Sequence, residues 1–179
     1  MMKRFMVVQA ALALGAAACT DEPLAPVVDE EEALRLPPGI HSYLTVSDRE
    51  APVGATIMVT ANLQVVDVPV TIAGYRLSLG YDAEALKPVE AKRADFGGIH
   101  VVNLAAPDGV RAAAAAPQGI EGPLLVLVAV AFQVKAPDYA KTLALSLDDV
   151  TALEEFQPVA SAVALIDQPV LTPRYLPRE

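Results

Sequence analysis

From His41 onward, hydrophobic residues recur at every second position within short segments, and turn residues separate these segments. This spacing matches a β-strand, in which neighbouring side chains point to opposite faces. No segment keeps the apolar spacing of an amphipathic helix over about twelve residues. The pattern predicts about nine strands, at Tyr43–Val46, Thr56–Leu63, Ala73–Tyr81, Pro88–Ala91, Ile99–Leu104, Val110–Ala116, Leu124–Val134, Thr142–Leu147 and Val159–Ile166.

Two of these segments also indicate their place in the fold. Ala73–Tyr81 has large apolar side chains on one face and small or polar ones on the other, so one face is expected in the core and one outside. Leu124–Val134 is apolar on both faces, which is typical of a central strand covered on both sides. Turn signals at Pro52-Val53-Gly54 and Pro107-Asp108-Gly109 separate neighbouring segments. These features predict an all-β sandwich or barrel without a long helix.

The N-terminal segment has a different pattern. Lys3 and Arg4 precede an apolar run over residues 5–18, and polar residues follow. A basic start, a short apolar stretch and small residues at its end are typical of a secretory signal peptide. The run has about 14 residues, whereas a membrane-spanning helix needs about 20. We therefore expect residues 1–18 to be a signal peptide and the protein to be exported.

The chain has a single cysteine, Cys19, directly after this run. Ala16-Ala17-Ala18-Cys19 resembles the bacterial lipoprotein processing site, in which the cysteine becomes the first mature residue and carries lipid. The resemblance implies a covalent lipid on Cys19, which would hold the protein at a membrane on the periplasmic or cell-surface side. The alternatives are an ordinary signal peptide cleaved near Ala18, or an uncleaved anchor. No other cofactor is expected.

The composition of the flanking segments predicts the limits of the folded domain. Residues 19–39 are rich in proline and acidic residues, which favours a semi-extended tether. The folded domain is expected over residues 40–168. Residues 169–179 carry a proline at every fourth position from Pro169, so this tail is not expected to form a central strand. It is predicted either to fray or to lie extended over a surface.

Charge and motifs exclude several functions. The net charge is −9 and no Lys/Arg cluster is present, which argues against a nucleic-acid partner. No hydrolase, metalloprotease or phosphate-loop motif occurs. His41 and His100, expected at the surface, are too few for a metal site. The acidic pairs Asp148-Asp149 and Glu154-Glu155, with Asp82, leave calcium open as an alternative to a solvated loop. The sequence therefore predicts a protein that is not an enzyme.

The order of several motifs resembles that of cohesin modules. Ile72–Leu86 is similar to their alternating strand, which ends in Tyr-Asp before a small turn. Pro52-Val53-Gly54 resembles their opening turn, Val110–Ala114 an arginine-containing strand, and Gly122–Val134 their long strand near the end. The resemblance spans about Tyr43 to Asp167. It implies an antiparallel jelly-roll sandwich that is not an enzyme and binds dockerin modules through one flat sheet face.

Five consecutive alanines, Ala112–Ala116, lie in one predicted strand. Small side chains let another surface approach closely, so this strand and the small-residue face of Ala73–Tyr81 are expected to form a docking face. The alternative is a compositional bias toward alanine. The candidate partner-binding residues are Gly74, Arg76, Ser78, Arg111, Ala113 and Ala115.

The function expected from these features is that of a lipid-anchored binding module. It would dock a protein partner by a sheet face or by its proline-rich tail. The partner is expected to be a dockerin-like module or an integral membrane complex of which this chain is an accessory subunit.

The alternative function is that of a cell-surface carbohydrate-binding module. Such modules stack sugars on exposed aromatic rings. The chain has no Trp, and Tyr75, Tyr81 and Phe132 fall on predicted core faces. Tyr139 and Phe156 are therefore the candidates for a sugar platform.

Overall fold

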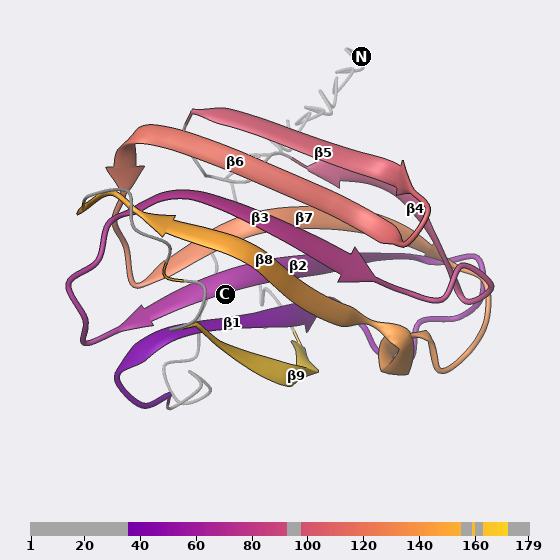
Figure 1. Ribbon diagram of the computed structural model, residues 1–179. Helices are drawn as coiled ribbons and strands as arrows, with labels where there is room; N and C mark the ends of the chain where they lie inside the picture. The colour runs from indigo at the N-terminus through magenta and orange to yellow at the C-terminus, as the bar shows by residue number, and fades with distance from the viewer. Residues whose placement is uncertain (1–35, 93–97, 155–158, 160–162, 172–179) are drawn as a thin grey trace, which may run out of the picture.

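The computed structural model describes residues 36–92, 98–154, 159 and 163–171. Within these ranges, nine strands form two sheets that pack face to face (Figure 1). A short 3₁₀ helix, η2 (Tyr139–Thr142), precedes the eighth strand. The strands are β1 (Gly39–Val46), β2 (Thr56–Val66), β3 (Ile72–Gly80), β4 (Leu86–Lys92), β5 (Ile99–Ala106), β6 (Gly109–Ile120), β7 (Leu124–Val134), β8 (Ala144–Ala152) and β9 (Val163–Leu171).

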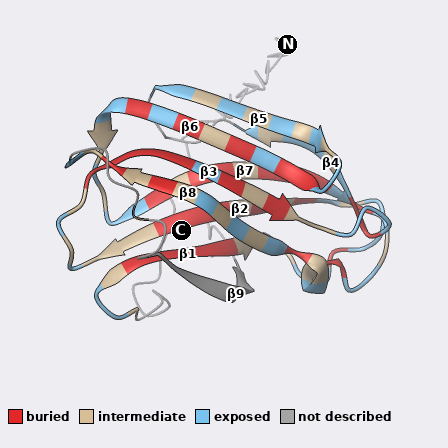
Figure 2. Ribbon diagram, in the orientation of Figure 1, coloured by how far each residue is buried: buried red, intermediate tan, exposed pale blue. Residues whose placement is uncertain are grey.

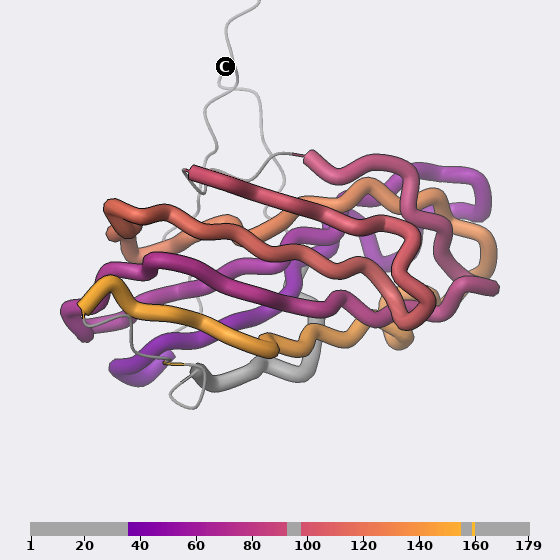
Figure 3. The backbone as a smooth tube through the Cα atoms, turned by 45° about the horizontal axis from the view of Figure 1, so that its top comes forward, coloured from indigo at the N-terminus to yellow at the C-terminus, as the bar shows by residue number. Residues whose placement is uncertain are grey.

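The larger sheet has the strand order β4-β7-β2-β1-β9, and the smaller sheet has the order β5-β6-β3-β8. Neighbouring strands are antiparallel, except that β1 and β9 run parallel at one edge. The two layers are also visible in the tilted view of Figure 3. Each of the nine predicted segments overlaps one observed strand, so the predicted all-β antiparallel sandwich is confirmed. No helix in the described ranges has the length and apolar character needed to cross a membrane.

The core lies between the two sheets, where both contribute alternate side chains (Figure 2). Leu77 and Leu79 of β3 are fully buried, whereas Ser78 between them is half-buried and Arg76 before them is exposed. From the larger sheet, Ile57 and Val59 of β2 face them across the core. Each such side chain contributes about 1.5–3 kcal/mol by leaving water. The prediction of one core face and one outer face for Ala73–Tyr81 is confirmed.

A β-bulge changes which residues of β7 face the core. Ala61 lies opposite Val128 and Asn62 lies opposite Val126, so Leu127 is an extra residue in β7. Because of this extra residue, Leu127 and Val128 are both fully buried although they are consecutive. The predicted strand Leu124–Val134 has the observed bounds, and it lies inside the sheet between β4 and β2. β7 is apolar at both odd and even positions partly because the bulge exchanges which of these positions face the core.

The bulge is tied to the opposite sheet by Tyr75 of β3. Its hydroxyl donates a hydrogen bond to the carbonyl oxygen of Leu127, and its ring is 4% exposed. An extra residue in a strand falls out of the ladder, so its carbonyl needs another donor when it is buried. Tyr75 supplies that donor from across the core, and burial raises the pKa of its phenol.

The C-terminal boundary of the domain differs from the expected one at residue 168. β9 continues through Pro169 to Leu171 and pairs with β1. Because β9 lies at the edge of the larger sheet, a proline that donates no hydrogen bond is tolerated there. The domain also begins one residue earlier than expected, at Gly39.

Two further predictions are wrong. His41 is not at the surface: it is 6% exposed, and its ring lies 2.8 Å from the Pro37 carbonyl oxygen. The reason is that β1 lies between β2 and β9 and starts with Gly39, beside which the imidazole packs. Asp148 and Asp149 lie not in a loop but in β8, where Asp148 is an extra residue between the partners of Leu77 and Arg76.

Tyr139 of η2 fixes the loop between β1 and β2. It is 1% exposed, its hydroxyl donates to the Asp48 carbonyl oxygen at 2.7 Å, and it accepts from the Ala51 amide at 3.0 Å. The hydroxyl therefore donates one hydrogen bond and accepts another within the protein, so its role is structural. Tyr139 is therefore not available as a sugar platform.

Replacing Tyr139 with phenylalanine is expected to lower the free energy of unfolding by about 1–3 kcal/mol, because the buried Ala51 amide is left without its acceptor. Urea unfolding followed by circular dichroism measures this change. Tyr43→Phe is the control: its hydroxyl bonds only the Gln64 side chain, at 3.2 Å, and its loss is expected to cost about 0.5–1.5 kcal/mol. Equal losses in the two variants would contradict the role given to Tyr139.

Several predicted features lie outside the described residues. These are the signal peptide over residues 1–18, Cys19, the tether up to residue 35, Phe156, Glu155 and the tail after Leu171.

Candidate docking face

The outward face of the smaller sheet brings the candidate partner-binding residues together. Arg76 of β3 lies opposite Ala113 of β6, and Ser78 lies opposite Arg111. In the next row, Gly74 lies opposite Ala115. The side chains of β3 and β6 at these positions all point away from the core, because the intervening residues of both strands are buried. All six predicted residues therefore share one face.

Gly74 has a different part in this face from the other five. It is buried in the sheet, and a Cβ at this position would lie 3.0 Å from the Ala114 carbonyl oxygen. Gly74 therefore keeps the surface flat and lets β6 approach β3 closely, rather than presenting a contact of its own.

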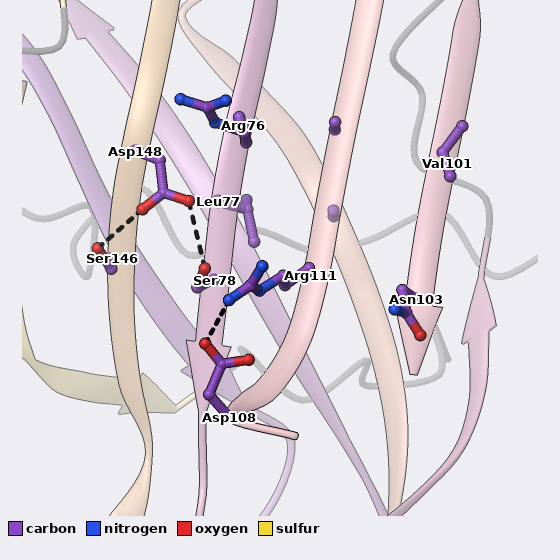
Figure 4. A pocket seen from close by; sticks show the side chains of 11 residues that line it. Arg76, Leu77, Ser78, Val101, Asn103, Asp108, Arg111, Ser146 and Asp148 are labelled. Carbon is purple, nitrogen blue, oxygen red and sulfur yellow. Dashed lines mark hydrogen bonds and ion pairs between the residues drawn. The ribbon is translucent and has the colours of Figure 1, made fainter. Parts of the chain in front are cut away.

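Four of the strands contribute to an open hollow of about 660 Å³ on this face. Figure 4 shows that Arg76 and Ser78 of β3 and Arg111 of β6 line it together with residues that the sequence analysis did not single out. The added residues come from the flanking strands and the turn before β6: Val101, Asn103, Asp108, Ser146 and Asp148. In the register of β5, Val101 lies opposite Ala113, and Asn103 lies opposite Arg111.

The sequence contained a partial signal for these added residues. Ile99–Ala106 alternates, but its two faces carry similar apolar residues, so the outward one could not be distinguished. In the structure the odd-numbered positions are exposed: Ile99 by 72% and Val101 by 61%. Asp148 keeps the outward phase of Ala144 and Ser146, and the bulge in β8 then places Asp149 opposite Arg76, which alternation alone does not predict.

The two arginines of the face differ in their charge partners. Arg111 donates to the Asp108 carboxylate at 2.5 Å, and this bond lowers the pKa of Asp108. Arg76 has neither a hydrogen bond nor an ion pair within the described residues. Both side chains of the Arg111–Asp108 bridge are more than half exposed, so the bridge orients them more than it stabilises the fold. Arg76 is thus a solvated cation ready for a partner's acceptor.

Asp148 sits on the opposite side of the hollow from β5. Its carboxylate accepts from Ser78 Oγ at 3.3 Å and from Ser146 Oγ at 3.4 Å. The face therefore has two parts. Charged and hydroxyl groups lie over β3, over β8 and at the start of β6, where Arg111 meets Asp108. Small or aliphatic side chains lie over the remainder of β6 and the facing part of β5: Ile99, Val101, Ala113 and Ala115.

The outward face of the larger sheet does not offer a comparable surface near β1 and β2. His41, Tyr43 and Asn62 lie on that face, yet they are only 5–7% exposed. The Asn62 amide donates to Thr45 Oγ1 at 3.2 Å. Polar groups there are used within the sheet, whereas those on the smaller sheet point into solvent.

The aromatic residues of the described ranges do not form a sugar platform. Tyr43, Tyr75, Phe132 and Tyr139 are at most 7% exposed. Tyr81 is half-buried and packs edge-on against Phe132, with ring centroids 5.0 Å apart. Stacking of sugars needs an exposed aromatic face, and no described ring provides one.

The described residues also lack a metal centre. No group of three or more His, Cys, Asp or Glu side chains within them is placed to hold a metal ion. Asp82 has a local role instead: its Oδ1 accepts from the Glu84 amide at 2.8 Å and starts the turn before β4. The calcium alternative thus finds no support at Asp148, Asp149 or Asp82.

The chain matches no protein-family model and no curated protein. Solved structures with the same fold are cohesin modules. The seventh ScaB type I cohesin of Pseudobacteroides cellulosolvens superposes with a TM-score of 0.56 at 16% identity, over 79% of this chain and 96% of that one. A non-cellulosomal cohesin of the archaeon Archaeoglobus fulgidus gives 0.54 at 18% identity, over 74% and 91%.

A third similar structure is the cohesin of a cohesin–dockerin complex from Clostridium thermocellum, with a TM-score of 0.55 and 16% identity over 76% of this chain and 95% of that one. The described part of the chain therefore has the fold of a cohesin module, and the resemblance drawn from its motifs is confirmed at the level of fold.

Proposed function

We propose that this chain is a non-enzymatic binding module that docks a protein partner through the outward face of β5, β6, β3 and β8. The observation that carries the proposal is the combination, on the outward face of the smaller sheet, of a flat stripe of small side chains with Arg76, a cation that has no hydrogen bond or ion pair among the described residues. Flat, mixed apolar and charged surfaces are typical of protein–protein interfaces rather than of small-molecule sites. Structures of the same fold form complexes with dockerin modules, and a dockerin-like module is the partner we propose.

The proposal includes the location of the module. An exported chain with lipid on Cys19 would hold the docking face near a membrane, where the partner can also be part of a membrane complex. The sequence pattern of residues 1–19 supports this part of the proposal. Mass spectrometry of the mature N-terminus tests it: a diacylglyceryl-modified Cys19 is the expected result, and an unmodified chain beginning elsewhere would contradict it.

Ala113→Arg is expected to weaken partner binding by about tenfold or more, which is about 1.4 kcal/mol. The reason is that a long side chain at the centre of the stripe holds an approaching surface away. The experiment compares the proteins retained from solubilised membranes and culture supernatant by the immobilised wild type and by each variant.

The matched control is Ala129→Arg. Ala129 is a partly exposed alanine inside β7, on the other sheet, opposite Thr60 and Lys92. A protein retained by the wild type and by the Ala129 variant, but not by the Ala113 variant, would support docking at this face. Retention that is unchanged by Ala113→Arg would overturn it.

A further inference from the structure

The edges of the two sheets are protected unequally. Edge strands present unpaired backbone N–H and C=O groups, and proteins usually block them with charges, prolines or bulges. The described sheets end in four edge strands, β4, β9, β5 and β8. β4 carries Pro88 and a bulge at Val89, β9 carries Pro169 beside a register shift, and β8 carries two acids with a bulge at Asp148.

β5 carries neither a charged residue nor a proline, and its register shift, between Asn103 and Ala106, lies at the end of the strand next to the turn into β6. Ile99–Ala106 contains no Lys, Arg, Asp, Glu or Pro, and it pairs with β6 in unbroken register from Ile99 to Asn103. Every second residue is exposed, as the alternating colours of β5 in Figure 2 show. Ile99 and Val101 are also the most exposed large hydrophobic side chains of the smaller sheet. A straight, uncharged and apolar edge of this kind is a template for a further strand.

We propose that the added strand is β5 of a second copy of this chain. Antiparallel pairing of β5 with itself about a two-fold axis would join the two smaller sheets into one continuous sheet. The axis stands perpendicular to the sheet, so outward side chains meet outward ones and inward side chains meet inward ones. With the axis at Val102, for example, Val101 of one copy lies opposite Asn103 of the other.

The absence of charge is the feature that favours a second copy as the occupant. In self-pairing, a strand meets its own sequence reversed, so a charge near the two-fold axis lies close to the same charge of the other copy. Like charges directly opposite each other destabilise a sheet. β8 would bring its two acids together in this way, and β4 its two lysines. β5 brings together only neutral side chains, and the exposed Ile99 and Val101 gain cross-strand neighbours.

This pairing uses the edge of the sheet and not its face, so it does not depend on the proposed docking function. It would place two docking faces side by side in one surface. A variant that blocks partner docking, such as Ala113→Arg, is expected to leave the pairing intact.

The test is disulfide cross-linking of the full chain. Cys19→Ser removes the only cysteine, and single cysteines are then introduced at Val101, Val102 or Asn103. Residues at the two-fold axis lie about 4.5–5.5 Å apart across an antiparallel pair, which is within the reach of a disulfide. Val89→Cys is the matched control, because Val89 is a valine on β4, an edge strand of the larger sheet, with 56% exposure, close to the 61% of Val101.

Under mild oxidation with oxidised glutathione, at least one of the β5 cysteines is expected to give severalfold more covalent dimer than the Val89→Cys control. Adding Val101→Lys to the cross-linking variant at Val102 or Asn103 is expected to abolish that excess, since it places two ammonium groups at the joint. Dimer yields from all three β5 positions that do not exceed the control would overturn the proposal, and so would an excess that survives Val101→Lys.

Discussion

Tyr75→Ala is expected to lower the free energy of unfolding by about 3–5 kcal/mol, the usual cost of removing a large buried ring. Tyr75→Phe keeps the ring and removes only the hydroxyl. It is expected to cost about 1–3 kcal/mol, because the carbonyl of Leu127 stays buried without a donor. The hydroxyl therefore accounts for a sizeable share of what Tyr75 contributes, since it satisfies the bulge in β7 from across the core.

Denaturant unfolding of Tyr75→Ala and Tyr75→Phe measures the contribution of the whole side chain and that of the hydroxyl alone. Tyr81→Phe is the control, because Tyr81 lies partly exposed against Phe132 and its hydroxyl makes no hydrogen bond within the described residues. That control is expected to change the free energy of unfolding by less than about 0.5 kcal/mol. If Tyr75→Phe changes the free energy of unfolding as little as Tyr81→Phe does, the hydroxyl of Tyr75 does not stabilise the bulge in β7.

The same residue predicts how stability changes in alkali. Burial raises the pKa of Tyr75 above its ordinary value of 10.0, so the folded state holds this proton more tightly than the unfolded state. The stabilisation is fully present below pH 10 and is lost as the pH rises above it. In Tyr75→Phe the free energy of unfolding should fall less steeply above pH 10. Some slope remains, since burial also raises the pKa of Tyr43 and Tyr139.

Gly109→Ala is the second substitution with a large expected effect. Gly109 has φ of +136°, and a Cβ there would lie 2.4 Å from the carbonyl oxygen of Leu79. The strained backbone costs about 1–3 kcal/mol, and the forced shift of β3 costs about 1–3 kcal/mol more. Thermal unfolding should therefore begin at a clearly lower temperature than in the wild type.

Gly54→Ala separates the two costs. Gly54 has φ of +90°, but nothing lies within 4 Å of the position that a Cβ would take. Its substitution is expected to cost only the backbone term, about 1–2 kcal/mol. If Gly109→Ala and Gly54→Ala lower the free energy of unfolding equally, the close approach of the Pro107-Asp108-Gly109 turn to β3 adds no cost to the Gly109 substitution.

Much of this fold could be predicted from the sequence because apolar and polar residues alternate along half-buried strands. The strand Leu124–Val134 was predicted with its observed bounds, and the outward and inward residues of Ala73–Tyr81 were assigned correctly. In Ala73–Tyr81 the local pattern and the tertiary environment agree, whereas in β7 the bulge at Leu127 changes the phase of the alternation. The pairing of Arg76 with Ala113 and of Ser78 with Arg111 then brought the candidate residues of two strands onto one surface.

The remainder depends on where a strand stands in its sheet, which alternation does not encode. His41 is buried because its ring packs beside Gly39 and lies 2.8 Å from the Pro37 carbonyl oxygen. Ile99 and Val101 are exposed although they are as apolar as core residues, and a bulge in β8 places Asp149 instead of Asp148 opposite Arg76. Bulges insert one residue without a sequence signature of their own, so they displace predictions by one position wherever they occur.

The parallel pairing of β1 with β9 has a consequence for biogenesis. The second neighbour of β1 is β9, so the larger sheet cannot be completed until β9 has been synthesised. At about 5–20 residues per second, the stretch between Val46 and Val163 takes roughly 6–24 s to make. Throughout that interval a hydrophobic strand has an open side in the nascent chain, and a chaperone that shields it would raise the yield of folded protein.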